Sequence, residues 1–424
     1  MYQKQTLKNK VRLITAPLKE TATATLLVMV RAGSRYENLK NNGVSHFVEH
    51  LMFKGTKKRP NTLALSKELD GVGAEYNAFT GKDYTGYYVK CDTRHLSLAI
   101  DVLSDMLLHS LFNPQEIQKE RGVIIEEINM YEDNPLMYAE DFFEQLMFSA
   151  NPLGYSIAGS RETVKNLSPL AITSYLKKLY TGKNIVIGLA GNFTPQHLSE
   201  IKNKFNFQLG NKKNTFRPIK IKQSKPRLKL LFKDTEQAQL VLGFPALSYF
   251  SKKIYALQLL AVILGGYMSS RLSLEVREKN GLAYFVRSWL NFYEDTGSFL
   301  VQSGLDKNRI EAATKLILSQ LAKIKKGVTV EELRRAKENL AGRLAIDLEN
   351  SSNLSHWHVI QEVLTGKILS PAEKINQLMK VTPKDIQQVA RQVINFNKLN
   401  LVIIGPFKED KKFKKIISDF NSSL

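Results

Sequence analysis

The 424-residue sequence has little cysteine, no long hydrophobic run and no excess of acidic residues, and each absence narrows the choice of protein class. The single cysteine, Cys91, excludes an internal disulfide framework and is typical of a reducing compartment. The longest apolar stretch, residues 255–268, has 14 residues with Gln258 inside it, whereas a bilayer-spanning helix needs about 20. The first residues lack the apolar core of a signal peptide. These features predict a soluble, cytoplasmic protein with no membrane partner.

Positive charge is abundant instead: 61 Lys and Arg stand against 40 Asp and Glu, which gives a formal net charge of +21. A basic chain can neutralise nucleic-acid phosphates, and eight basic residues with no acidic one lie between Lys212 and Lys229. No zinc finger, aromatic RNA-binding signature or helix-turn-helix pattern accompanies them. Net charge bears on solubility and nonspecific contacts rather than on fold. A solvated, lysine-rich surface is therefore favoured over a specific nucleic-acid partner.

The sequence is predicted to consist of two related halves joined by a linker. Residues 211–229 are basic, contain Pro218 and Pro226, and show no clean periodicity. They separate a first domain, residues 1–210, from a second, residues 230–424. A strand pattern followed by an Asp and an amphipathic helix occurs in both halves, and its glycines, Gly86 and Gly297, are 211 positions apart. This repeat indicates a duplicated domain.

Short apolar segments typical of strands lie near the beginning and the end of each half. They are residues 25–30, 184–189, 237–244 and 400–404. Helical periodicity dominates residues 114–147, with a break at Asn134 and Pro135. Because strands and helices alternate irregularly, we predict an α+β fold with two homologous domains, each a mainly antiparallel β-sheet packed with α-helices on one side, rather than a doubly wound parallel sheet.

The segment HFVEH at residues 46–50 carries the clearest chemical signal. On a helix, residues i, i+3 and i+4 share a face, which brings His46, Glu49 and His50 together. Zinc catalysis needs neutral imidazoles on one side of the metal, an open coordination position and a base beside the coordinated water. The H-x-x-E-H pattern is one of the arrangements that zinc peptidases use. The segment predicts His46 and His50 as ligands and Glu49 as the general base.

A carboxylate is the usual third ligand beside two histidines. The helical segment that begins at Pro114 offers five glutamates, at residues 116, 120, 126, 127 and 132. Glu120 and Glu127 share a face, whereas Glu126 points about 100° away. Spacing alone leaves Glu126 and Glu127 as alternatives.

Residues 43–56, GVSHFVEHLMFKGT, resemble the zinc-binding helix of the pitrilysin family, which includes insulin-degrading enzyme and the mitochondrial processing peptidase. Residues 120–127, ERGVIIEE, resemble the segment that carries this family's third ligand, and Glu127 follows His50 by 77 residues, as the family's spacing requires. The resemblance implies one zinc ion per chain, held by His46, His50 and Glu127, with Glu120 as a supporting carboxylate.

Two further segments resemble parts of the same family. Residues 73–80, GAEYNAFT, resemble the edge strand onto which a substrate peptide adds as an extra strand, which implies substrate contacts at Asn77, Ala78, Phe79 and Thr80. Residues 269–284 resemble an element of the second domain in which an Arg and a Tyr seven residues later reach the substrate bound at zinc. Arg277 and Tyr284 have this spacing. Without the resemblance, both would be interpreted as surface residues.

The second half lacks a metal motif of its own. At an offset of 213 residues, the positions of His46, Glu49 and His50 correspond to Leu259, Val262 and Ile263. These apolar residues are predicted to pack a helix into a core.

The resemblance implies a zinc-dependent endopeptidase that hydrolyses peptides or unfolded segments inside a closed chamber. The family builds this chamber from four related domains, so a chain with two is expected to form a homodimer or to pair with a related subunit. The alternative is a noncatalytic scaffold or partner subunit, because the family includes members that have lost their chemistry. Such members are expected to lack part of the zinc set or the Arg/Tyr element, and this sequence has both.

Overall fold

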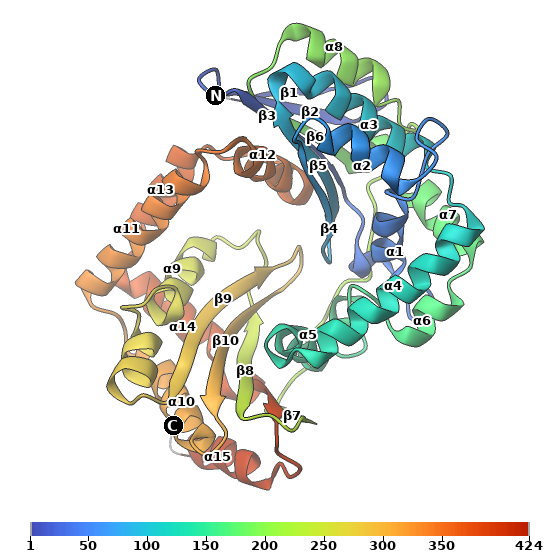
Figure 1. Cartoon of the computed structure of the whole chain (residues 1–424). Coiled ribbons are helices and arrows are strands. Elements are labelled where there is room, and N and C mark those ends of the chain that lie inside the picture. Colours follow the sequence, from blue (N-terminus) through green and yellow to red (C-terminus); the bar gives the residue numbers. More distant parts are fainter. Residues whose placement is uncertain (1, 423–424) are drawn as a thin grey trace. The chain divides into compact units, whose positions relative to one another are not determined.

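The computed structural model describes residues 2–422, which form two compact units (Figure 1). The first unit comprises residues 1–129, 155–217 and 344–370, and the second comprises residues 130–154, 218–343 and 371–424. Each unit therefore receives a segment from the other half of the sequence. No helix among the described residues is long and apolar enough to cross a membrane.

The first unit contains a six-stranded mixed sheet. Its spatial order is β1-β2-β6-β3-β5-β4, and only the β2–β6 pair is parallel. Strands β3 and β6 are buried along nearly their whole length, in agreement with their mainly apolar sequences. The strands are β1 (Gln3–Thr6), β2 (Arg12–Pro17), β3 (Thr23–Val30), β4 (Glu75–Thr80), β5 (Thr85–Asp92) and β6 (Ile185–Gly191).

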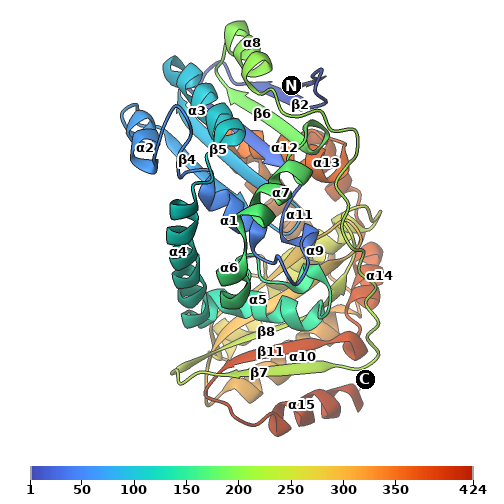
Figure 2. The ribbon, with the colours of Figure 1, turned by 90° about the vertical axis from the view of Figure 1, so that its right-hand side faces the viewer.

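The second unit repeats this topology with five strands in the order β7-β11-β8-β10-β9, in which only β7 and β11 are parallel. Figure 2 shows β8, β11 and β7 side by side. The strands are β7 (Arg227–Phe232), β8 (Gln237–Ala246), β9 (Ala283–Phe292), β10 (Gly297–Asp306) and β11 (Asn400–Gly405). The irregular segment before β7 spans residues 205–226, so residues 227–229 already belong to the strand. The α+β class and the mostly antiparallel sheets are confirmed.

Helices of the first half of the chain pack mainly on one face of the first sheet. They are α1 (Val44–Leu51), α2 (Thr62–Asp70), α3 (Leu96–His109), α4 (Pro114–Asp133), α5 (Pro135–Met147), α6 (Arg161–Asn166), α7 (Pro169–Leu179) and α8 (Pro195–Lys204). The break predicted at Asn134 and Pro135 is confirmed, because the Asn134 side chain caps the N-terminus of α5 and Pro135 is its first residue. Helix α5 is the exception, since it belongs to the second unit.

The second half contributes α9 (Ile254–Gly265), α10 (Ile310–Ile324), α11 (Val330–Asp347), α12 (Ser351–Thr365), α13 (Pro371–Met379), α14 (Pro383–Val393) and α15 (Lys411–Ser422). Helix α9 stands in the position that α1 has in the first half. As predicted, Leu259 and Ile263 are buried in the core, and Val262 packs against it.

One helix of each half covers the sheet face that the other helices leave open. Helix α12 packs on β3 and β6 in the first unit (Figure 1). Its residues Val359 and Val363 share a buried apolar cluster with Leu27 and Met29 of β3. Helix α5 packs on β8 and β11 in the second unit in the same way. The sequence did not predict this exchange, because an apolar helix face does not specify which sheet it will cover.

Candidate metal centre

Helix α1 is anchored so that one side enters the core and the other stays polar. Val44, Phe47, Val48 and Leu51 are buried, while His46, Glu49 and His50 lie on the other side. The carboxylate of Glu37 caps the N-terminus, where it accepts hydrogen bonds from the N–H groups of Gly43 and Ser45, both at 2.8 Å. A carboxylate at this end of a helix satisfies free N–H groups and complements the helix dipole.

Gly43 itself permits this entry into the helix. Its φ is +93°, and a Cβ atom added there would lie 2.7 Å from the carbonyl oxygen of Ala158. A larger residue would be strained and would clash with backbone. The backbone conformation and the close approach of Ala158 therefore explain why a glycine precedes the histidine motif.

The structure brings together the side chains of His46, His50 and Glu127. The Nε2 atoms of His46 and His50 are 3.3 Å apart. Oε2 of Glu127 lies 3.5 Å from Nε2 of His46 and 3.4 Å from Nε2 of His50. Glu126, the alternative that spacing left open, is exposed, and its carboxylate is near the Asn129 amide at 3.4 Å.

These three distances match the requirements of a small tetrahedral ion. Ligand atoms about 2.0–2.1 Å from a tetrahedral zinc ion stand about 3.4 Å from one another. Two imidazoles and one carboxylate are also a ligand set that catalytic zinc sites use. The residues present therefore fit zinc, and a tetrahedral ion held by these three groups would take one further ligand.

Glu120 supports this arrangement from the same helix. Its Oε2 lies 3.0 Å from Nδ1 of His50, and its Oε1 pairs with Nζ of Lys54 at 2.6 Å. A carboxylate on the far nitrogen of a ligand histidine fixes the tautomer that presents Nε2 to the metal. Glu120 thus has the contact expected of a supporting carboxylate.

The two histidines titrate differently in the metal-free site. Burial, together with the positive charge of His50, lowers the pKa of His46 to about 4. Burial also opposes a charge on His50, but hydrogen bonds to Glu120 and Glu127 outweigh it and raise its pKa to about 9. Without metal at neutral pH, His50 carries a proton and His46 does not.

Glu49 points into the same site and accepts a hydrogen bond from the hydroxyl of Thr80. Burial raises the pKa of Glu49, and this hydrogen bond opposes the shift. Thr80 was predicted as a substrate-strand residue, and its contact with Glu49 was not foreseen. The contact orients one carboxylate oxygen and leaves the other available.

Strand β4 is the edge strand of the first sheet and pairs only with β5 among the described strands. Its two faces differ: Ala78 packs with the core beside α1, whereas the Phe79 ring lies 5.5 Å from the His356 ring of α12. Asn77 is exposed, and its Oδ1 accepts a hydrogen bond from the N–H of Ala78. The free edge is available for an added strand, but contact of these residues with substrate stays a prediction.

Arg277 and Tyr284 belong to the second unit. Arg277 lies on a π-helical turn (Ser273–Lys279), with Nη1 3.3 Å from Sδ of Met268. Tyr284 is the second residue of β9 and is 77% exposed. Their action at the metal centre stays a prediction.

Two family models match consecutive parts of the chain. Residues 12–161 match the family described as Insulinase (Peptidase family M16), and residues 166–340 match the Peptidase M16 inactive domain. The chain belongs to the M16 peptidase family. An M16 relative in Bacillus subtilis, named as an uncharacterized zinc protease, is 35% identical over 408 residues, which cover 96% of this chain and 98% of that protein. A zinc protease of Streptomyces coelicolor is 35% identical over 96% of this chain and 90% of its own length.

Solved structures share the M16 fold. A protease from Helicobacter pylori matches with a TM-score of 0.90 and 25% identity, covering 96% of this chain and 99% of that chain. A peptidase M16 inactive domain structure from Pseudomonas fluorescens has a TM-score of 0.88 at 18% identity, over 96% and 98% of the two chains. The predicted membership of this peptidase family is confirmed.

Sequence reasoning missed Glu37 in this M16 chain. The residue lies eight positions before Ser45, outside the helix that it caps, so no helical spacing connects them. Only the path of the intervening loop brings its carboxylate to the helix N-terminus. An acidic residue before a glycine-initiated helix was the one available signal.

Zinc binding at neutral pH is expected to release close to one proton. Zinc requires neutral imidazoles, and His50, with a pKa of about 9, must lose its proton whereas His46 is already neutral. Titration calorimetry in buffers of different ionisation enthalpy would measure the release. The number of protons released should fall toward zero above pH 9. The absence of proton release at pH 7 would contradict the protonated state of His50 in the metal-free chain.

Proposed function

We propose that this M16 chain is a zinc-dependent endopeptidase, which hydrolyses peptides or unfolded segments with water as the nucleophile. The observation that carries the proposal is the mutual spacing of 3.3–3.5 Å among two imidazole nitrogens and one carboxylate oxygen. The zinc protease names of the relatives agree with it.

His46, His50 and Glu127 would hold the ion, and Glu120 would orient His50. When bound, zinc lowers the pKa of a coordinated water and polarises a carbonyl group. Glu49 stands on the same helix face as the two histidines, so its carboxylate is in place to accept the proton of the attacking water. It would then return that proton to the leaving amine.

The free edge of β4 supports a peptide substrate held by its backbone. An added strand forms main-chain hydrogen bonds along the edge, and these do not depend on side-chain identity. Alternate side chains of the peptide would face the metal side and the α12 side, as those of β4 do. This mode of binding suits an endopeptidase of low sequence specificity.

The proposal is tested by metal analysis and peptide hydrolysis on the purified chain. We expect one zinc ion per chain, cleavage within mixed unstructured peptides, loss of cleavage on chelation and recovery with zinc. Bound zinc without cleavage of any peptide, alone or with a related subunit, would instead favour the noncatalytic scaffold.

Tyr284→Phe is expected to lower kcat by about 10²–10³-fold, the usual cost of removing one oxyanion donor. KM should change less, because the peptide backbone would be held mainly by β4. The side chain is 77% exposed, so folding and zinc content should be preserved. Steady-state kinetics would measure both constants. Arg277→Ala is expected to raise KM more than Tyr284→Phe does. A normal kcat in Tyr284→Phe would exclude the tyrosine from the chemistry.

The active form is expected to be a homodimer or a pair with a related subunit. By the family resemblance, four related domains enclose the substrate, and this chain provides two. Light scattering at the assay concentration would give the mass of the active species. A monomer with full activity would contradict the expectation.

A further inference from the structure

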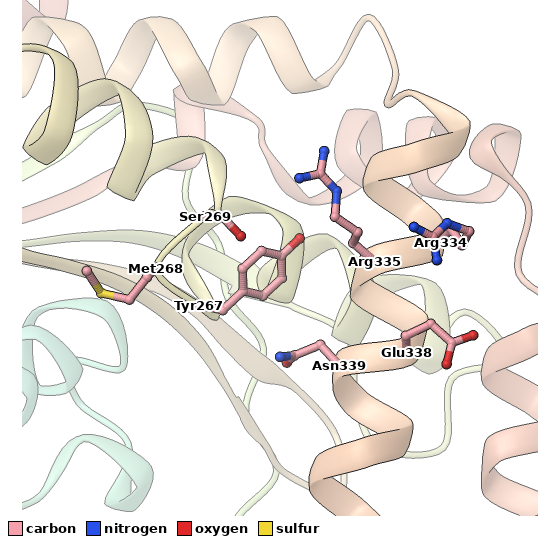
Figure 3. A pocket seen from close by; sticks show the side chains of 7 residues that line it. All are labelled: Tyr267, Met268, Ser269, Arg334, Arg335, Glu338 and Asn339. Carbon is pink, nitrogen blue, oxygen red and sulfur yellow. The ribbon is translucent and has the colours of Figure 1, made fainter.

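The second unit has a groove between the segment after α9 and the exposed side of α11 (Figure 3). Its volume is about 510 Å³, within the range of ligand pockets. The segment after α9 contributes Tyr267, Met268 and Ser269, and α11 contributes Arg335 and Asn339 among others. We call this the α9–α11 groove. Helices α9 and α11 have the places in the second half of the chain that α1 and α4 have in the first. The groove therefore corresponds in position to the space between the two helices that carry His46, His50 and Glu127.

Polar groups in the α9–α11 groove converge on one side of α11. Figure 3 shows the side chains of Tyr267 and Asn339 extending toward the same hollow, with Arg335 beside Tyr267. Arg334 and Glu338, which also line the groove, extend from the other side of the helix in this view. Oδ1 of Asn339 is shielded from solvent and accepts no hydrogen bond from the described residues. Because a buried acceptor is normally satisfied, we expect the Asn339 amide, which lines the groove, to turn so that Oδ1 meets an N–H of a bound ligand.

Two arginines and one glutamate, Arg334, Arg335 and Glu338, line the groove, so its formal charge of +1 favours a carboxylate. Arg335 and Arg334 share one carboxylate, that of Glu331, at 3.3 and 2.9 Å. Arg335 and Glu331 are each about half exposed, at 48% and 52%, and exposed ion pairs are weak. The planar guanidinium of Arg335 can therefore exchange this partner for a ligand carboxylate, which it binds through two parallel hydrogen bonds.

The α9–α11 groove also adjoins the predicted substrate element. Met268, which is 59% exposed, lies on its rim and contacts Nη1 of Arg277 through its sulfur at 3.3 Å. A peptide that reaches Arg277 would pass within one side chain of the groove. This position points to a segment of the substrate itself as the ligand.

We propose that the α9–α11 groove binds a carboxylate-bearing residue of the peptide substrate. This inference rests on the proposed function. The carboxylate pairs with Arg335, the residue's N–H donates to Oδ1 of Asn339, and its aliphatic part lies against Tyr267 and Met268. The carboxylate belongs either to the C-terminus of the peptide or to an Asp or Glu side chain.

The test measures the binding of fluorescent peptides by fluorescence anisotropy. The chain carries Glu49→Gln, so the peptides are not expected to be cleaved during the measurement. Three peptides of one sequence are compared: one with an internal Glu and a free C-terminus, one amidated at the C-terminus, and one with Glu replaced by Gln. Arg335→Gln is the test variant. Arg343→Gln is its control, because Arg343 is exposed on the same helix and does not line the groove.

The Kd for the carboxylate peptide is expected to rise roughly tenfold in Arg335→Gln and to stay unchanged in Arg343→Gln. Asn339→Leu should weaken binding independently, and Glu338→Gln, which removes the groove's own carboxylate, should strengthen it. The modified peptide that loses affinity identifies the source of the carboxylate. Equal affinity for all three peptides, or equal effects of the two arginine variants, would overturn the proposal. If the groove prefers the carboxylate peptide but the unmodified chain cleaves no peptide, the proposed function is refuted and the proposed groove is not.

Discussion

Glu49→Gln is expected to lower kcat by about 10²–10⁴-fold, the contribution typical of a general base. The amide has nearly the same shape and can still accept a hydrogen bond from Thr80, but it cannot take a proton from water. Zinc content should be unchanged, because Glu49 is not one of the three clustered ligand groups. Peptide hydrolysis and metal analysis on the same preparation would measure both quantities.

Glu126→Gln is the matched control for this variant. Glu126 is an exposed glutamate on α4 whose carboxylate is near Asn129 and not in the His46–His50–Glu127 cluster. Its substitution should leave kcat and zinc content unchanged. A Glu49→Gln protein with the activity of the Glu126→Gln protein would remove Glu49 from the mechanism.

His46→Ala and His50→Ala are expected to abolish stoichiometric zinc binding. Each leaves only two ligand groups, whereas catalytic zinc sites use three protein ligands. Glu127→Gln should weaken binding, because a neutral amide replaces the charged ligand. Glu120→Gln should lower zinc affinity about 10–100-fold through loss of its hydrogen bond to His50. Competition with a chromophoric chelator would rank the four variants.

Glu126→Gln serves again as the control, because it removes the same charge from the neighbouring position. Zinc loss in Glu126→Gln with zinc retained in Glu127→Gln would reverse the choice between the two glutamates. Circular dichroism would verify that the histidine variants keep their fold, since His46 is only 8% exposed.

The grouping of His46, Glu49 and His50 on helix α1 was predictable because the information for it is local. Residues three and four apart on a helix must share a face, so the sequence alone places His46, Glu49 and His50 together. The strands β3, β6, β8 and β11 were likewise evident from short apolar runs, and the break between α4 and α5 from Asn134 and Pro135. The duplicated topology followed from the repeated order of these local patterns.

The choice between Glu126 and Glu127 was not local. Adjacent residues of a helix point about 100° apart, so the choice depends on how α4 is rotated against α1. The apolar side chains Ile117, Ile124 and Ile128 fix that rotation by entering the core, which directs Glu120 and Glu127 toward the histidines. The family resemblance selected the same residue without this reason.

The sequence by itself determined local features: several of the helices and strands, which side of α1 bears the histidines, and that the second half has no metal motif. The tertiary structure decided which partners these features meet. It places Glu37 at the N-terminus of α1, Thr80 on Glu49, and helices α5 and α12 on the sheets of the opposite halves. The physical reason is the distance along the sequence over which each kind of information acts. Helical and strand periodicity depends on neighbours a few positions away, whereas these contacts join residues whose separation in sequence carries no periodic signal and which only the packed core brings together.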